Sequence, residues 1–197
     1  MISIVDYGAG NLRSVQNTLA EIGAAYRLID DPAEVAAAEK LILPGVGHFG
    51  QIMRSLDAMR VRKPLLAYIL SGKPFLGICI GMQGLYEGSE EDESVAVLGV
   101  FPGKVKRFPQ DALVPHMGWN LITPQRESPL LIQLPARPFV YFANSYYAPV
   151  QPETVAACDY HGAFAAAVQQ QNVWGVQFHP EKSGALGLQV LRNFAAC

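Results

Sequence analysis

The order of apolar and polar stretches predicts that strands alternate with helices in the first half of the chain. Short apolar runs, long enough for buried strands, are separated by segments in which apolar residues recur at helical spacing. The predicted strands are residues 2–5, 25–29, 40–43 and 75–78, and the predicted helices are residues 12–22, 49–59 and 64–70. This alternation is typical of an α/β fold with a parallel sheet, in which ligands bind beyond the carboxyl ends of the strands.

The second half of the chain has a different pattern. From Val95 onwards, short candidate strands follow one another without helices between them, and prolines and glycines separate them. These candidate strands are residues 103–108, 117–122, 139–148, 155–160, 163–169 and 173–178. Residues 170–172 resemble a hairpin turn, and apolar residues four apart in residues 184–196 predict a closing helix. We therefore predict antiparallel strands that extend the sheet or pack on it.

Composition and charge narrow the range of functions. The chain has 197 residues, half of them hydrophobic, which is compatible with one domain around a sizeable core. A net charge of -2 gives no reason to expect nucleic acid or an anionic membrane as a partner. The apolar runs are far shorter than the roughly 20 residues that span a bilayer. The first residues resemble a strand and not a signal peptide, so we expect a cytoplasmic protein with reduced thiols.

The stretch Gly77-Ile-Cys79-Ile-Gly81 carries the most chemical information. It directly follows the predicted strand 75–78, and we predict that a helix continues through Tyr86. A cysteine between two glycines on such a turn parallels the Gly-x-Ser-x-Gly nucleophile elbow, and a helix N-terminus favours the thiolate. The alternative is a buried structural cysteine, since free cysteines are often buried.

A base for this thiol is found near the C-terminus. His179 follows the strand 173–178, Pro180 ends that strand, and Glu181 lies two residues beyond the histidine. A histidine can accept the thiol proton, while a carboxylate fixes its tautomer and stabilises the imidazolium. The pair therefore favours a nucleophilic role for Cys79.

Two other patterns predict no cofactor and no metal. Gly8-Ala-Gly10 lacks the third glycine of a dinucleotide fingerprint, because position 13 is Arg. Cys158 and His161 are spaced as half of a zinc site, but no second pair completes four ligands.

The elbow and the His-Pro-Glu segment together resemble the class I, or triad, glutamine amidotransferases, whose fold is a flavodoxin-like α/β sheet flanked by helices. Four stretches resemble more narrowly the glutaminase subunits of imidazole glycerol phosphate synthases. They are Asp6-Tyr-Gly-Ala-Gly-Asn-Leu12, Leu43-Pro-Gly-Val-Gly47, Pro115-His-Met-Gly-Trp-Asn120 and His179-Pro-Glu-Lys-Ser183. Two positions depart from the family pattern: Ile80 replaces the usual Leu, and Asn144 stands where a His is expected.

The resemblance implies a reaction and a set of site residues. It implies that Cys79 attacks the side-chain amide of glutamine, that His179 moves the protons, and that Glu181 orients the histidine. Val46 and Ile80 would supply backbone N–H groups to an oxyanion hole. The residues implied to contact L-glutamine are Gly45, Gly47, Gln83, Glu91, Ser145 and Tyr146. Glu91, in an acidic loop, would meet the α-ammonium group.

The resemblance also implies a partner. In this family the ammonia passes to a separate (β/α)8 cyclase subunit, with which the glutaminase forms a heterodimer in histidine biosynthesis. The candidates for the partner-facing surface are Asn11, Trp119, Asn120, Tyr141 and Lys182. Two alternatives stay open. One is a glutaminase that serves another synthase, such as that of pyridoxal phosphate synthesis, and the other is a non-enzymatic binding module on the same fold.

Overall fold

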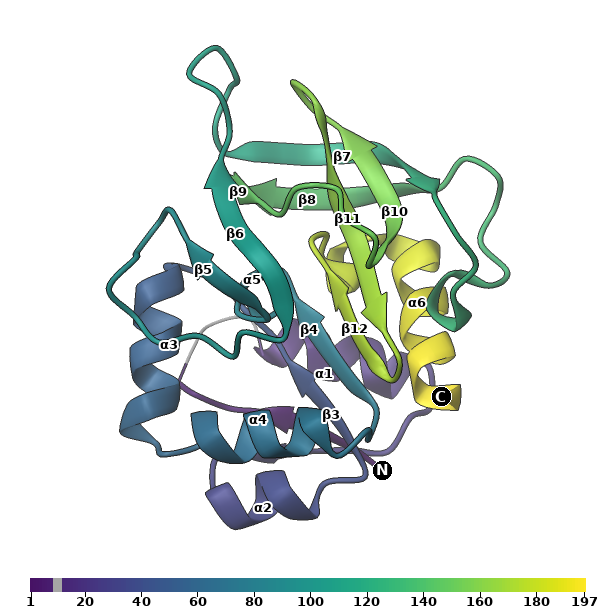
Figure 1. Cartoon of the computed structure of the whole chain (residues 1–197). Helices are drawn as coiled ribbons and strands as arrows, with labels where there is room; N and C mark the ends of the chain where they lie inside the picture. Colours follow the sequence, from purple (N-terminus) through teal and green to yellow (C-terminus); the bar gives the residue numbers. More distant parts are fainter. Residues whose placement is uncertain (9–11) are drawn as a thin grey trace.

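The computed structural model of the chain, described for residues 1–8 and 12–197, contains a nine-stranded mixed sheet (Figure 1). The strand order is β2 (Tyr26–Ile29), β1 (Ile2–Val5), β3 (Lys40–Leu43), β4 (Phe75–Ile78), β12 (Val173–Val176), β11 (Ala163–Gln170), β10 (Thr154–Asp159), β7 (His116–Pro124) and β8 (Phe139–Asn144). The strands from β2 to β12 in this order pair in parallel, and those from β12 to β8 pair antiparallel. The predicted α/β fold with added antiparallel strands is therefore confirmed.

Helices cover both faces of the parallel half of the sheet. The helices are α1 (Leu12–Glu21), α2 (Pro32–Ala37), α3 (Phe49–Ala58), α4 (Arg62–Leu70), α5 (Ile80–Gln83) and α6 (Gly184–Ala196). Helix α1 contacts α6 on one face, while α4 contacts α2 and α3 on the other (Figure 1). Strands β1, β4 and β12 are buried along their whole length, which explains why they are apolar apart from the small buried Ser3 and do not alternate with exposed polar residues.

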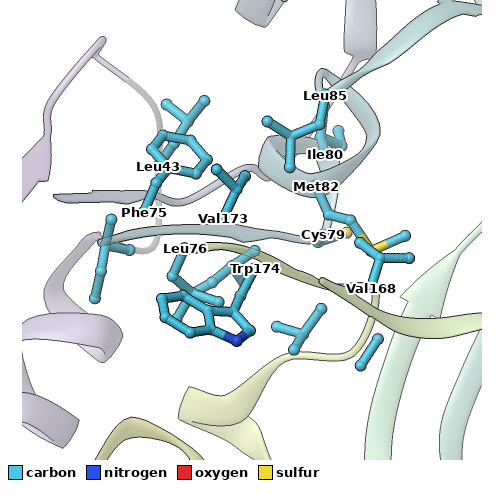
Figure 2. Close-up of a cluster of buried hydrophobic side chains, with 14 of the residues drawn as sticks. Leu43, Phe75, Leu76, Cys79, Ile80, Met82, Leu85, Val168, Val173 and Trp174 are labelled. Atoms are coloured by element: carbon cyan, nitrogen blue, oxygen red, sulfur yellow. The ribbon is translucent and has the colours of Figure 1, made fainter. Parts of the chain in front are cut away.

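Strand β12 returns from the antiparallel half to the centre of the sheet. It forms a hairpin with β11, in which Gln170 pairs with Val173 across a two-residue turn, and it then pairs in parallel with β4. Val176 lies opposite Ile78 in that pairing. Figure 2 shows side chains of β4 and β12 in one apolar cluster. The ends of these two strands, which carry the predicted nucleophile and base, are therefore neighbours.

A smaller sheet lies beside the elbow. Its order is β5 (Tyr86–Ser89), β6 (Phe101–Arg107) and β9 (Tyr146–Tyr147). The two short 3₁₀ segments of the described chain are η1 (Pro129–Leu131) and η2 (Pro180–Lys182). No helix within the described residues is long and apolar enough to cross a membrane.

Three local predictions were wrong. Helix α2 was missed, although Asp31 caps it by accepting a hydrogen bond from the Ala33 N–H at 2.7 Å. The helix after Cys79 ends at Gln83, and Tyr86 begins β5, because the chain leaves the elbow to form the smaller sheet. The predicted strand 139–148 is divided between the two sheets, since β8 pairs with β7 while β9 pairs with β6.

Candidate active site

Cys79 occupies a strained turn between β4 and α5. Its backbone has φ 53° and ψ -110°, a conformation that residues other than glycine rarely adopt. The residue is 4 % exposed. A Cβ atom on Gly81 would overlap the Leu43 carbonyl oxygen, and one on Gly45 would overlap the Gly81 nitrogen. Both glycines are therefore needed for the loop after β3 to lie directly against the elbow.

His179 and Glu181 form a buried pair at the end of β12. The Nδ1 atom of His179 lies 2.8 Å from Oε1 of Glu181, and the two side chains are 3 % and 2 % exposed. Burial opposes protonation of His179, but the hydrogen bond and charge of Cys79, followed by those of Glu181, outweigh it and raise its pKa to about 10. Cys79 and Glu181 together therefore favour the imidazolium form of His179.

A cavity of about 250 Å³ opens in front of the thiol. Its lining brings together most of the residues that the sequence predicts for glutamine binding: Gly47, Gln83, Glu91, Ser145 and Tyr146, together with Val46, Cys79, Ile80 and His179. Gly45 does not line the cavity, since it faces the elbow backbone. Lys182, predicted for the partner surface, lines the cavity, as do Pro115, Ala143 and Asn144, for which the sequence predicted no contact with glutamine.

The acidic loop contributes a restrained carboxylate to this cavity. Oε2 of Glu91 accepts a hydrogen bond from the Phe49 N–H at 3.3 Å, and Oε1 lies 3.5 Å from Nδ1 of His48. Burial raises the pKa of Glu91, and His48 and the Phe49 N–H partly offset this rise. A carboxylate held in this way is suited to a small cationic group such as an α-ammonium.

The Val46 peptide lies between two cavities. Val46 and Gly47 line the cavity in front of Cys79 and also a second one, of about 280 Å³, that contains Tyr7. The Tyr7 hydroxyl donates to the Pro44 carbonyl at 2.8 Å. Burial raises the pKa of Tyr7, while a hydrogen bond from the Val46 backbone N–H to its oxygen opposes the rise. The N–H that we predicted as an oxyanion donor thus interacts with Tyr7 in this conformation.

Gln177 is a site residue that sequence reasoning missed. It is fully buried, and its Nε2 lies 3.6 Å from the Cys79 sulfur as a hydrogen-bond donor. Its Oε1 accepts a hydrogen bond of 2.9 Å from Gln83. The available signal was a polar residue at the end of an apolar strand, two positions before the proposed base.

The predicted partner-facing residues separate into two groups. Trp119 pairs with Tyr141 across β7 and β8, their rings meet edge to face at 6.2 Å, and Lys182 lies over the Tyr141 ring. Asn120 points to the opposite face of β7 and donates to the Asp159 carbonyl at 3.2 Å. Asn11 lies outside the described residues. Met117 and Phe139, which were not predicted, share the face of Trp119 and are also exposed.

The chain is similar in sequence and in fold to known glutamine amidotransferases. The family "Glutamine amidotransferase class-I" matches residues 3–196. A solved glutamine amidotransferase is similar with a TM-score of 0.78 and 17 % identity, covering 100 % of this chain and 99 % of the other. PurLQS from Thermotoga maritima has a TM-score of 0.75 and 20 % identity, with 98 % and 96 % covered. The chain belongs to the class-I glutamine amidotransferases.

Curated relatives specify the family further. Each of the following is named "Imidazole glycerol phosphate synthase subunit HisH". The relative from Desulfitobacterium hafniense is 46 % identical over 196 residues, covering 98 % of this chain and 93 % of its own. Those from Syntrophotalea carbinolica and Methanosarcina barkeri are 48 % identical and cover 98 % of this chain, with 98 % and 96 % of their own lengths matched. Within its class, the chain therefore belongs to the HisH family.

Proposed function

We propose that this chain is the glutaminase subunit of an imidazole glycerol phosphate synthase and releases ammonia from glutamine at Cys79 for use in histidine biosynthesis. The observation that carries the proposal is the buried contact of His179 with Glu181 beside Cys79, at a cavity that also holds Glu91. Nucleophile, base and orienting carboxylate are the three parts that thiol-dependent acyl transfer needs.

The geometry supports a two-stage reaction. The Cys79 thiolate attacks the side-chain amide carbon of glutamine, and the imidazolium of His179 gives its proton to the departing nitrogen, so ammonia leaves and a glutamyl thioester remains. The neutral His179 then takes a proton from water, whose oxygen attacks the thioester and releases glutamate and the thiolate. Glu181 keeps the imidazole oriented and stabilises its charged form throughout.

The oxyanion hole is where we propose that the partner acts. The N–H of Ile80, at the start of α5, is one donor by its position, and the second would be the N–H of Val46. In this conformation the Val46 N–H interacts with Tyr7, which competes with its use as that second donor. Rotation of the Val46 peptide would complete the hole, and a partner that binds the rotated form better would activate the enzyme.

The partner that we propose is a separate (β/α)8 cyclase subunit, which would use the ammonia to form imidazole glycerol phosphate and an aminoimidazole carboxamide ribotide. Met117, Trp119 and Phe139 expose 64 %, 56 % and 46 % of their surface on one face of the sheet edge. Exposed apolar groups gathered on one face are typical of an interaction site. Lys182 connects this face with the active-site cavity, because it contacts Tyr141 and lines the cavity.

The test compares three preparations by their rate of glutamate release: the isolated chain, its complex with the cyclase subunit, and the complex with the cyclase ligand bound. We expect the isolated chain to be slow and the liganded complex to be about 100- to 1000-fold faster, the usual effect of one oxyanion donor. Equal rates in all three would rule out the switch. A cyclase subunit that neither co-purifies with this chain nor takes up its ammonia would contradict the proposed partner.

Trp119→Ala tests the interaction face separately. We expect it to weaken co-purification with the cyclase subunit, because it removes the largest exposed apolar side chain of that face. Leu70→Ala is the matched control, since Leu70 is 73 % exposed on α4 and is not part of the face. Equal binding by the two variants would exclude this face.

A further inference from the structure

A chain of buried amides leads from the backbone to the nucleophile. Nε2 of Gln83 donates to the Tyr146 carbonyl at 3.0 Å and to Oε1 of Gln177 at 2.9 Å. Nε2 of Gln177 then lies 3.6 Å from the Cys79 sulfur, with donor geometry. Gln83 and Gln177 are 2 % and 0 % exposed, so water does not compete for these bonds.

The backbone carbonyl at one end sets the direction of every bond in this chain. A carbonyl oxygen only accepts, so the group of Gln83 that faces Tyr146 must be its NH₂. That NH₂ also faces Gln177, which must therefore present its oxygen to Gln83. The remaining end of the Gln177 amide is its NH₂, and it points at sulfur. The orientation of both amides follows from the acceptor at Tyr146 and does not depend on the state of the thiol.

We propose that Gln177 is a further catalytic residue, which donates a hydrogen bond to the Cys79 sulfur and thereby stabilises the thiolate. The inference rests on the proposed glutaminase chemistry at Cys79 and adds to it a second group that holds the nucleophile. A donor fixed on sulfur favours the charged form over the thiol, because a neutral thiol is a weak acceptor. Gln83 is then a positioning residue, which holds the amide of Gln177 in the donating orientation.

The donor from Gln177 acts among several titratable groups. His179, supported by Glu181, faces the sulfur from the end of β12, and Tyr7 faces it from the end of β1. Glu91 and Lys182 line the same cavity. All of these groups remain in place when Gln177 is replaced by an uncharged residue. A change in the ionisation of the Cys79 thiol would then be due to the loss of the Gln177 amide.

The experiment measures the rate of alkylation of Cys79 by iodoacetamide as a function of pH, with the modified peptides quantified by mass spectrometry. In Gln177→Met, which is similar in size but has no donor, we expect the midpoint pH for Cys79 to rise by about 1–2, as the loss of one hydrogen bond to a charged group predicts. The fall in glutamate release at neutral pH should be about tenfold or more. Cys197 is exposed in the same molecule and serves as an internal reference that should not change.

A second variant keeps the test decisive if Gln177→Met does not fold. Gln177→Leu is likewise uncharged and has no donor, so the midpoint should rise to a similar extent. Gln83→Met should give a smaller rise, because the amide of Gln177 remains but loses its fixed orientation. An unchanged midpoint in a folded Gln177 variant would overturn the inference. A wild-type chain that releases no glutamate in the liganded complex would instead contradict the proposed function.

Discussion

Replacing Glu181 by glutamine tests how the carboxylate supports the histidine. The Nδ1–Oε1 distance is 2.8 Å, and the side chains are 3 % and 2 % exposed, so the bond is charge-assisted and shielded from water. A charge-assisted bond of this kind stabilises its partners by about 1.5–3 kcal/mol, compared with about 0.5–1.5 kcal/mol for a neutral hydrogen bond. Glu181→Gln should therefore raise the activation free energy by about 1–2 kcal/mol. At about 1.4 kcal/mol per factor of ten, kcat should fall by about 5- to 30-fold.

His179→Ala should be more damaging, by about 100- to 10 000-fold, because it removes the proton transfer itself. The assay is glutamate release by the complex with the cyclase subunit. The carboxylate also holds the imidazolium, so Glu181→Gln should lower the pKa of His179 and move the alkaline limb of the pH profile to lower pH. Glu34→Gln is the control, since it neutralises a carboxylate in an exposed pair with Arg27. A loss in Glu181→Gln that exceeds the loss in His179→Ala would refute this division of roles.

Three further predictions concern the thiol, the loop and a buried histidine. In the complex, Cys79→Ser should abolish synthesis of imidazole glycerol phosphate from glutamine but leave its synthesis from added ammonia intact. Near-normal glutamate release by the folded variant would exclude Cys79 as the nucleophile. Tyr7→Phe should raise glutamate release by the isolated chain, because it frees the Val46 N–H. Tyr68→Phe is the control, since it also loses a hydroxyl bonded to backbone and should not raise the rate. Equal rates in the two variants would count against Tyr7 as a restraint. Burial lowers the pKa of His116 to about 4, compared with about 6.5 in the unfolded chain. As the pH falls from about 6.5 to about 4, the unfolded chain therefore binds a proton that the folded chain does not, and the folded state loses stability. Between pH 7 and 5, the free energy of unfolding of the wild type should fall by about 1–2 kcal/mol more than that of His116→Phe. Thermal unfolding at the two pH values measures both, and identical falls would contradict this role of His116.

Local pattern was sufficient for most of the elements and for the candidate nucleophile and base. Apolar runs such as 2–5 and 75–78 identify buried strands, because a strand covered on both faces has no polar side to display. Cys79 between glycines and His179 before Pro180 are also local signals, since each marks how one strand ends. Such features depend on neighbours in the chain, which a sequence shows directly.

The remaining features depend on which strands are adjacent in space. The contact between Gln177 and Cys79 joins residues 98 positions apart, and it exists because β12 returns to pair with β4. Tyr7 follows β1 and Val46 follows β3, so they come together only because these two strands pair. A polar residue in an apolar strand or a turn of glycines has no partner until the sheet is assembled. The sequence by itself determined most of the elements and the reacting groups, and the tertiary structure decided which groups orient and restrain those reacting groups.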